Sequence, residues 1–469
     1  MVFSSFSFIF VFLPALILPY FLIPKRLRTA RNVLLLAFSL FFYSCGGVRF
    51  LPVMIASIAV NYVGGLICGS VKRWRRLALC ITVAADLGML FWFKYAGFFA
   101  ANISLLGINV SIPEIVMPIG ISFFTFQGMS YAIDVYRKDA GVEKNPLKVA
   151  LYISFFPQLV AGPIVRYNTV AAEIAERNES FEDFSAGAVR FVFGLTKKLI
   201  VANACAEIAD AAFGTDTAAL TSTFAWLGAI AYTLQIYFDF SAYSDMAIGL
   251  GRMFGFRFEE NFNYPYAADS ITDFWRRWHI SLSTWFRDYL YIPLGGSRRS
   301  TARNIFNLAV VWLLTGFWHG AEWSFLIWGV FYFLLLIGER YIWGKLLKKV
   351  PVLSRAYTLF FVVIGWVLFR ADGVREAWGY ICAMFTAPFA DGRTVYYLAE
   401  YAYILLPALI FCLPIKRAVA RFFENRAKTS KACGMIRTLF PPIAALALLA
   451  VSYIKLMSST FNPFIYFRF

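Results

Sequence analysis

Histidine is almost absent from this sequence, which has only two among its 469 residues, His279 and His319. Charge is scarce as well, because 15% of the residues are charged and 60% are hydrophobic. Soluble globular domains carry about 25% charged residues. These shortages exclude an ordinary soluble enzyme of this length, and they make each histidine a residue whose presence needs a reason.

Sequence motifs for several common chemistries are also missing. The seven cysteines form no C-x-x-C pair, which argues against a disulfide framework and a structural zinc site. Two histidines without nearby cysteines or paired carboxylates make a poor metal site, so we expect no bound metal. There is neither a G-x-S-x-G nucleophile turn nor a Walker-type phosphate loop.

Apolar runs near 20 residues recur from end to end, and this is the length that crosses a bilayer as a helix. We predict an all-α polytopic membrane protein with eleven or twelve spanning helices, forming a single domain over residues 1–469. Basic clusters at 25–31 and 71–76 are separated by two of the apolar runs. Because basic loops stay in the cytoplasm, we expect both clusters there and the N-terminus outside.

The net charge of +17 does not indicate a nucleic-acid partner. The basic residues lie in short clusters between the apolar runs, where membrane topology alone places them. We therefore expect contact with the lipid bilayer and no nucleic acid. Residues 265–300 are aromatic but too charged to span, so we expect interfacial or re-entrant helices there.

His319 lies at the end of an apolar run that begins after Arg303, and a second apolar run follows it toward Arg340. Basic residues at both outer ends predict a hairpin whose tip points away from the cytoplasm. An ionisable residue within a membrane is a functional candidate. Imidazole can act as the general base for a hydroxyl that attacks an acyl thioester. A hydrogen-bonded structural histidine between helices is the alternative.

Three further polar residues each allow more than one interpretation. His279, in "RRWHISLS", is a second proton carrier, a residue that orients an acyl donor, or an interfacial histidine among aromatics. Asp239 and Asp245 either line a proton or ion path, as in a transporter, or pair with hydroxyls or nearby arginines. We find no internal repeat of the kind that transporters tend to show.

Two stretches resemble a known family: "FWRRWHISLSTWFRDYLYIPLGGSR" (274–298) and "WHGAEWSFLIWG" (318–329). They resemble the membrane-bound O-acyltransferases, most closely the bacterial branch with alginate and peptidoglycan O-acetyltransferases and the D-alanyl transferases of teichoic acid. "PIGISFFTFQGMSYAIDVYR" (118–137) and "NFNYPY" (261–266) match this branch too. The resemblance covers nearly the whole chain.

The resemblance implies a ring of transmembrane helices around a thin centre, with a tunnel joining the two faces. His319 matches the catalytic histidine of the family, and His279 matches its second histidine position. No cofactor would be bound, and acetyl-CoA or a carrier-bound thioester would bring the acyl group from the cytoplasm. Arg276 and Arg277 would then meet donor phosphates, although inside-positive charge explains them equally well.

The C-terminal residues 438–469 are predicted to form a last span and an aromatic tail, "MSSTFNPFIYFRF". The tail resembles the acyl-transfer motif of the small partner peptide in the D-alanyl system. By that likeness Tyr466 would take the acyl group and pass it to a periplasmic or surface esterase-like partner. The alternative is an aromatic anchor at the membrane interface.

The sequence thus predicts a multi-pass O-acetyltransferase of the bacterial cytoplasmic membrane. The expected acceptor is an extracytoplasmic polysaccharide, either an alginate-like exopolysaccharide or peptidoglycan. Transfer of D-alanine to teichoic acid is the alternative within the same class. A proton-coupled transporter is the alternative from another class.

Overall fold

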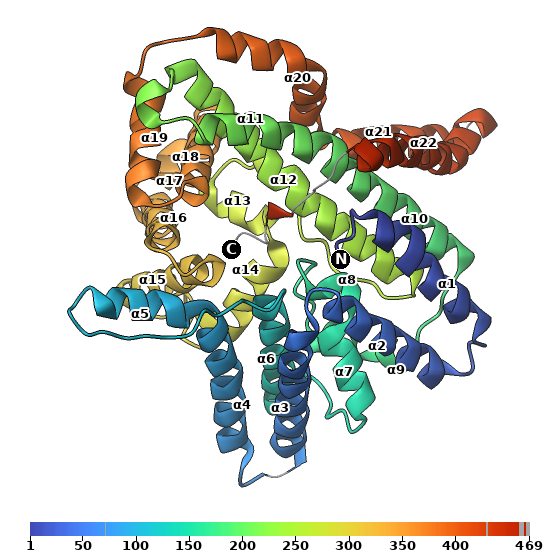
Figure 1. The fold of residues 1–469 in the computed structure, drawn as a ribbon. Coiled ribbons are helices and arrows are strands. Elements are labelled where there is room, and N and C mark those ends of the chain that lie inside the picture. Colours follow the sequence, from blue (N-terminus) through green and yellow to red (C-terminus); the bar gives the residue numbers. More distant parts are fainter. Residues whose placement is uncertain (71, 428–429, 459–463, 466–469) are drawn as a thin grey trace. The chain divides into compact units, whose positions relative to one another are not determined.

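The computed structural model describes residues 1–70, 72–427, 430–458 and 464–465 (Figure 1). The described residues form helices and connecting loops and contain no strand, as the sequence predicts. They divide into two compact units. Unit 1 comprises Met1–Phe191 and Met246–Glu259, and unit 2 comprises Val192–Asp245 and Glu260–Phe469.

Unit 1 holds the N-terminal helices and the greater part of α10. In chain order they are η1 (Phe8–Phe12), α1 (Leu13–Leu22), α2 (Arg28–Ser44), η2 (Val48–Phe50), α3 (Leu51–Ser70), α4 (Arg75–Leu90), η3 (Phe91–Tyr95), α5 (Ala96–Ser104), α6 (Ile121–Arg137), α7 (Pro146–Ser154), α8 (Phe156–Leu159), α9 (Tyr167–Ala175) and α10 (Phe181–Thr196). The predicted first spans correspond to η1 with α1, α2 and α3.

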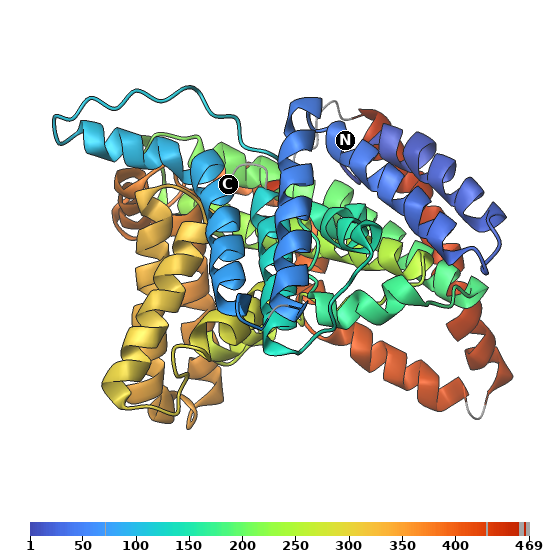
Figure 2. The same cartoon turned by 90° about the horizontal axis from the view of Figure 1, so that it is seen from below.

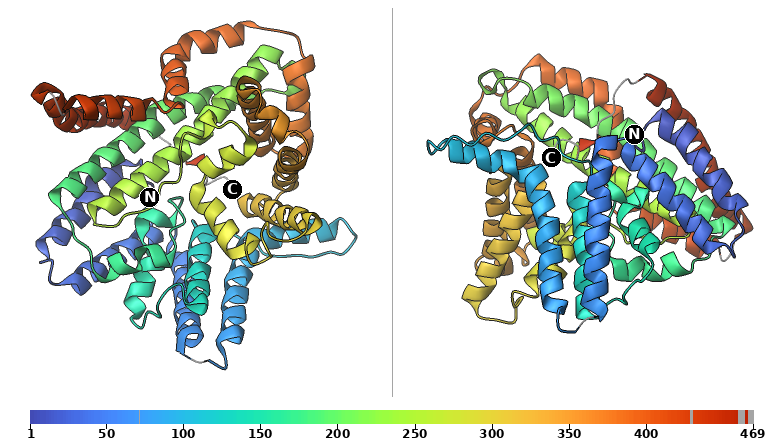
Figure 3. Two further views of the ribbon diagram at one scale, coloured as in Figure 1. Left: turned by 180° about the vertical axis from the view of Figure 1, so that it is seen from behind. Right: turned by 60° about the horizontal axis from the view of Figure 1, so that its bottom comes forward.

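Helices α3, α4 and α6 of unit 1 lie side by side (Figure 3). Small residues allow this, since a Cβ at Gly64 would lie 2.0 Å from the Thr82 hydroxyl. The buried Asn61 side chain donates a hydrogen bond of 3.0 Å to Asp86. A polar pair of this kind joins neighbouring helices where water cannot replace the bond.

Unit 2 holds most of α12 and every later helix. In chain order they are η4 (Lys197–Ala202), α11 (Asn203–Phe213), η5 (Thr217–Ala219), α12 (Ser222–Met253), η6 (Pro265–Ala267), α13 (Ile271–Arg277), α14 (Ile280–Phe286), η7 (Arg287–Tyr291), α15 (Thr301–His319), α16 (Trp323–Tyr341), α17 (Gly344–Leu347), α18 (Pro351–Arg370), α19 (Val374–Thr386), α20 (Gly392–Phe411), α21 (Ile415–Ala427) and α22 (Lys431–Ser458).

The hairpin predicted around His319 is present in unit 2. Helix α15 ends at His319, and α16 begins four residues later and packs beside it (Figure 2). The predicted interfacial region folds as the short helices α13 and α14, followed by the π-helical turn η7. None of these three segments is long enough to span a bilayer, which agrees with the sequence-based expectation.

Six described helical segments are long and apolar enough to cross a membrane. They are Val48–Ser70, Arg75–Ser104, Trp323–Tyr341, Pro351–Arg370, Gly392–Phe411 and Ala432–Ser458. The protein is therefore a multi-pass membrane protein. The total of eleven or twelve spans and the tunnel stay predictions.

A buried charge cluster fixes the α1–α2 hairpin of unit 1 to the loop before α10. Glu179 accepts a 2.6 Å hydrogen bond from Tyr20 and pairs with Arg28 and Arg31, and Arg177 donates to the Tyr20 hydroxyl at 2.9 Å. Burial opposes ionisation of Glu179. The hydrogen bonds from Arg28 and Tyr20 nevertheless outweigh burial and lower its pKa to about 2.

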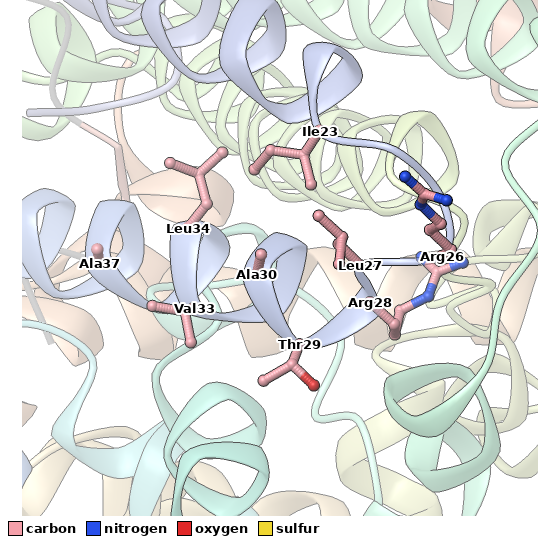
Figure 4. Close-up of a pocket in the computed structure, with 9 residues that line it drawn as sticks. All are labelled: Ile23, Arg26, Leu27, Arg28, Thr29, Ala30, Val33, Leu34 and Ala37. Carbon is pink, nitrogen blue, oxygen red and sulfur yellow. The ribbon is translucent and has the colours of Figure 1, made fainter.

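An open surface hollow of about 740 Å³ lies over the same hairpin (Figure 4). Arg26 and Arg28 lie at one end, and apolar side chains such as Leu27, Val33 and Leu34 line the rest. Neither histidine lines it, so its size does not make it the candidate active site.

Replacing Glu179 with glutamine should destabilise the protein by roughly 3–5 kcal/mol, because it leaves buried arginines without a counter-charge. Thermal unfolding in detergent measures this. The exposed Glu182→Gln is the control and should stay within about 0.5 kcal/mol. Since the pKa is lowered from 4.5, the contribution is complete above that pH and is lost as the pH falls toward 2. The difference in unfolding free energy between the parent and Glu179→Gln should therefore narrow as the pH falls from 4.5 toward 2. A difference independent of pH would contradict the role of the Glu179 charge.

Candidate active site

His319 is the last residue of α15 and is 5% exposed. Its ring packs edge-on against Trp328 and Phe369, each with centroids 5.2 Å away. These neighbours come from α16 and α18, so three helices hold the imidazole in place. The imidazole therefore lies among aromatic side chains and is shielded from water.

Two glycines let the backbones of α15 and α16 approach closely just before His319. A Cβ at Gly316 would lie 2.3 Å from the carbonyl oxygen of Phe325, and one at Gly329 would lie 2.5 Å from that of Trp312. Real Cβ atoms do not occur at such distances, so any larger side chain must separate the two helices. The placement of His319 therefore depends on these glycines.

His279 lies at the break between α13 and α14 and is 1% exposed. Its φ of +44° is in the left-handed region, which costs energy for a residue other than glycine. Strained residues of this type cluster at functional sites when the surrounding contacts fix them.

Asn261 fixes the ring of His279. Its Oδ1 accepts from the backbone N–H of Ser281 at 3.1 Å, which identifies this atom as the amide oxygen. The same oxygen lies 3.3 Å from Nδ1 of His279. Because an amide oxygen only accepts, Nδ1 carries the proton and Nε2 keeps its lone pair.

The structure brings the two histidines to the same indole ring. Trp318 lies 6.0 Å from the ring of His279 and 5.0 Å from the ring of His319, measured between centroids. Residues 40 positions apart in the sequence thus form one buried cluster within unit 2. Two imidazoles around one indole can hold reacting groups in a site shielded from water. Burial lowers the pKa of His279 to about 3, so this ring stays neutral.

Residues 137–371, half of the chain, match the membrane-bound O-acyltransferase family. The chain is 40% identical, over all of both sequences, to the probable alginate O-acetylase AlgI of Azotobacter vinelandii. It is 37% identical to the peptidoglycan O-acetyltransferase of Helicobacter pylori, over 80% of this chain and 78% of that one.

The chain belongs to the membrane-bound O-acyltransferase family. Membership makes it an O-acyltransferase, as the sequence predicts. The teichoic acid D-alanyltransferase of Bacillus subtilis is more distant, with 30% identity over 54% of this chain and 68% of that protein.

The arginines predicted to meet donor phosphates differ in their surroundings. Arg277 forms an ion pair of 2.8 Å with Asp273, one turn earlier on α13. Arg276 is exposed on the same helix. Arg276 is thus the better placed of the two for an external phosphate, and the donor role of both stays a prediction.

The acids considered as a transport path form ion pairs with consecutive lysines of η4. Asp239 lies 2.6 Å from the Nζ of Lys198, and Asp245 pairs with Lys197. The sequence-based alternative was pairing with hydroxyls or arginines, and the structure pairs both acids with lysines. Tyr466 lies outside the described residues.

Sequence reasoning missed two residues of this candidate site. Asn261 is part of the recognised stretch "NFNYPY", but only the folded chain places it against His279. Glu339 of α16 is buried and accepts hydrogen bonds from the backbone N–H groups of Ile271 and Thr272, at 2.6 and 2.9 Å. It thereby caps α13, the helix that leads to His279.

Gly329→Ala should destabilise the protein by roughly 1–3 kcal/mol, because the added Cβ overlaps the Trp312 carbonyl. Gly88→Ala on α4 is the matched control, since a Cβ there meets nothing within 4 Å. It should be neutral or stabilising by up to about 1 kcal/mol, the helix preference of alanine over glycine. Thermal unfolding of both purified variants measures the difference. Equal stability of the two would show that α15 and α16 do not need this close approach.

Proposed function

We propose that the protein O-acetylates an extracytoplasmic polysaccharide, an alginate-like exopolysaccharide or peptidoglycan. The observation that carries this proposal is the buried cluster of His279, Trp318 and His319, in which Asn261 holds the ring of His279. The relatives named as alginate and peptidoglycan O-acetylases support the acetyl group and the class of acceptor.

The first step uses a thioester donor on the cytoplasmic side, either acetyl-CoA or a carrier-bound acetyl group. His319 takes the proton of the attacking hydroxyl, and the hydroxyl oxygen forms a bond to the acetyl carbonyl carbon. The carbon–sulfur bond breaks, and the leaving thiolate takes a proton back from the imidazolium. His279 assists by orienting the acyl donor with a neutral ring, because burial lowers its pKa to about 3 and opposes its protonation. Arg276 and Arg277 contribute positive charge for donor phosphates.

The hydroxyl that attacks first is that of Tyr466 in the C-terminal tail. A phenol is a modest nucleophile and a good leaving group, so it can accept the acetyl group and release it again. A hydroxyl of an extracytoplasmic esterase-like partner attacks the tyrosine ester, takes the acetyl group to the polysaccharide, and restores the phenol. This scheme places the protein in the bacterial cytoplasmic membrane with its tail facing out.

The two alternatives have less support. D-Alanyl transfer to teichoic acid has the more distant relative, which matches about half of this chain. A proton-coupled transporter is disfavoured by family membership, and its proposed acids are engaged by Lys197 and Lys198.

His319→Ala and Tyr466→Phe should each abolish acetylation of the surface polysaccharide. Mild base releases ester-linked acetate from the isolated polysaccharide, and the amount is compared between cells with equal membrane levels of each variant. Loss of the base stops proton transfer, and loss of the phenol oxygen stops the relay.

Tyr403→Phe is the control for losing a phenol oxygen, because Tyr403 is 68% exposed on α20, and it should leave the acetate yield unchanged. If only His319→Ala loses acetate, the acyltransferase remains and the relay through Tyr466 is wrong. Normal acetate with His319→Ala would return this histidine to a structural role.

Asn261→Leu should lower the acetylation rate by about 10- to 100-fold, the range found when the hydrogen-bond partner of a metal-ligating histidine is removed. Without the amide oxygen, His279 loses the partner that keeps the proton on Nδ1. Asn261→Asp, which keeps an acceptor oxygen, should retain more activity than Asn261→Leu. The early rate of acetate incorporation is measured for the parent, Asn261→Leu and Asn261→Asp. A normal rate in Asn261→Leu would show that Asn261 has no role in the reaction.

A further inference from the structure

The carboxylate of Asp239 has two different partners within unit 2. It lies in the interior of α12 and is 1% exposed. Its Oδ1 lies 2.6 Å from Nζ of Lys198, while its Oδ2 accepts a 2.8 Å hydrogen bond from the backbone N–H of Ile465. A buried carboxylate is stable only when its charge is paired and its oxygens are hydrogen-bonded. The end of the chain completes that set.

The residue before Ile465 is anchored by aromatic packing. Phe464 is 3% exposed, and its ring lies 4.8 Å from that of Tyr243 and 6.2 Å from that of Phe240, between centroids. Phe240 in turn packs edge-on to His279 at 4.7 Å. One aromatic ring therefore separates Phe464 from the histidine of the candidate site.

The anchor has a recognisable chemistry. Lys198 neutralises the Asp239 carboxylate and contacts its Oδ1. Its Oδ2 accepts the backbone N–H of Ile465. The bond to Ile465 involves only the main chain, whereas the pocket of Tyr243 and Phe240 selects an aromatic side chain at 464. Charge-assisted hydrogen bonds of this type are stronger than neutral ones.

We propose that the Lys198–Asp239 pair is the docking point of the C-terminal tail and positions Tyr466 for acyl transfer. Ile465 directly precedes Tyr466 in the sequence, so an anchor at Ile465 acts on the residue that carries the acetyl group. Asp239 is a positioning residue in this scheme, since it acts through the tail and not on the acyl group. The inference rests on the proposed function, in which Tyr466 carries the acetyl group.

The test measures docking directly in the full-length protein. Ile465→Cys keeps the backbone N–H and places a thiol at a site that is 5% exposed in the docked tail. The rate at which maleimide labels this introduced thiol, followed by peptide mass spectrometry, reports how often the tail leaves its site. Adding Asp239→Asn should raise this rate about tenfold, the factor expected for weakening one hydrogen bond to a charged acceptor.

Two further variants keep the test interpretable. Asp245 lies on α12, as Asp239 does, and pairs with Lys197 of η4. Asp245→Asn breaks this neighbouring ion pair and should change the labelling rate less than about twofold. Asp239→Leu combined with Lys198→Met removes both charges together and avoids an unpaired lysine, so it should fold and still show the faster labelling. An unchanged labelling rate in both Asp239 variants would overturn the docking site, and so would equal acceleration by Asp245→Asn.

A second readout separates this inference from the proposed function. Mass spectrometry of the same proteins, isolated from cells that acetylate their polysaccharide, reports acetyl-tyrosine at Tyr466 whichever thioester is the donor. We expect it in the parent and much less of it in the Asp239 variants. Faster labelling in those variants without any acetyl-tyrosine in the parent would support the docking site and contradict the relay.

Discussion

Every interruption of a helix in a membrane protein leaves backbone groups that lipid cannot satisfy, and the candidate site is built around such interruptions. His279 lies where α13 gives way to α14, and His319 lies where α15 ends. The N–H groups freed at the start of α13 go to the carboxylate of Glu339, and the N–H of Ile280 goes to the carbonyl of Asn261 at 3.0 Å. The protein therefore supplies the partners that water would supply in a soluble enzyme.

The same residues that satisfy the backbone also orient the chemistry. Asn261 takes the N–H of Ile280 with its main chain and faces Nδ1 of His279 with its side chain. Glu339 belongs to α16, the second helix of the His319 hairpin, and caps the helix before His279. The two histidines are thus linked by the contacts that make the broken helices possible, and a change in either contact affects both stability and proton transfer.

The sequence was sufficient for the features that depend on local pattern. Apolar runs bracketed by basic residues predicted the α15–α16 hairpin, and excess charge among aromatics predicted the short helices between 265 and 300. It could not predict the left-handed backbone of His279, because that conformation depends on contacts with residues 18 and more positions away. The role of Glu339 was hidden for the same reason, since its partners lie 67 and 68 positions earlier.

The two adjacent lysine–aspartate pairs differ in what else the aspartate contacts. Lys197 and Lys198 are adjacent, and each neutralises one acid of α12. Of these two acids, Asp239 also accepts the N–H of Ile465, and it lies beside Phe240, whose ring contacts His279. If the pair served only to neutralise two buried charges, apolar residues could replace it, often at no cost in stability. A carboxylate at 239, next to the Phe240 ring that contacts His279, is therefore best explained as a hydrogen-bond acceptor. Its donor is the backbone N–H of Ile465 in the C-terminal tail.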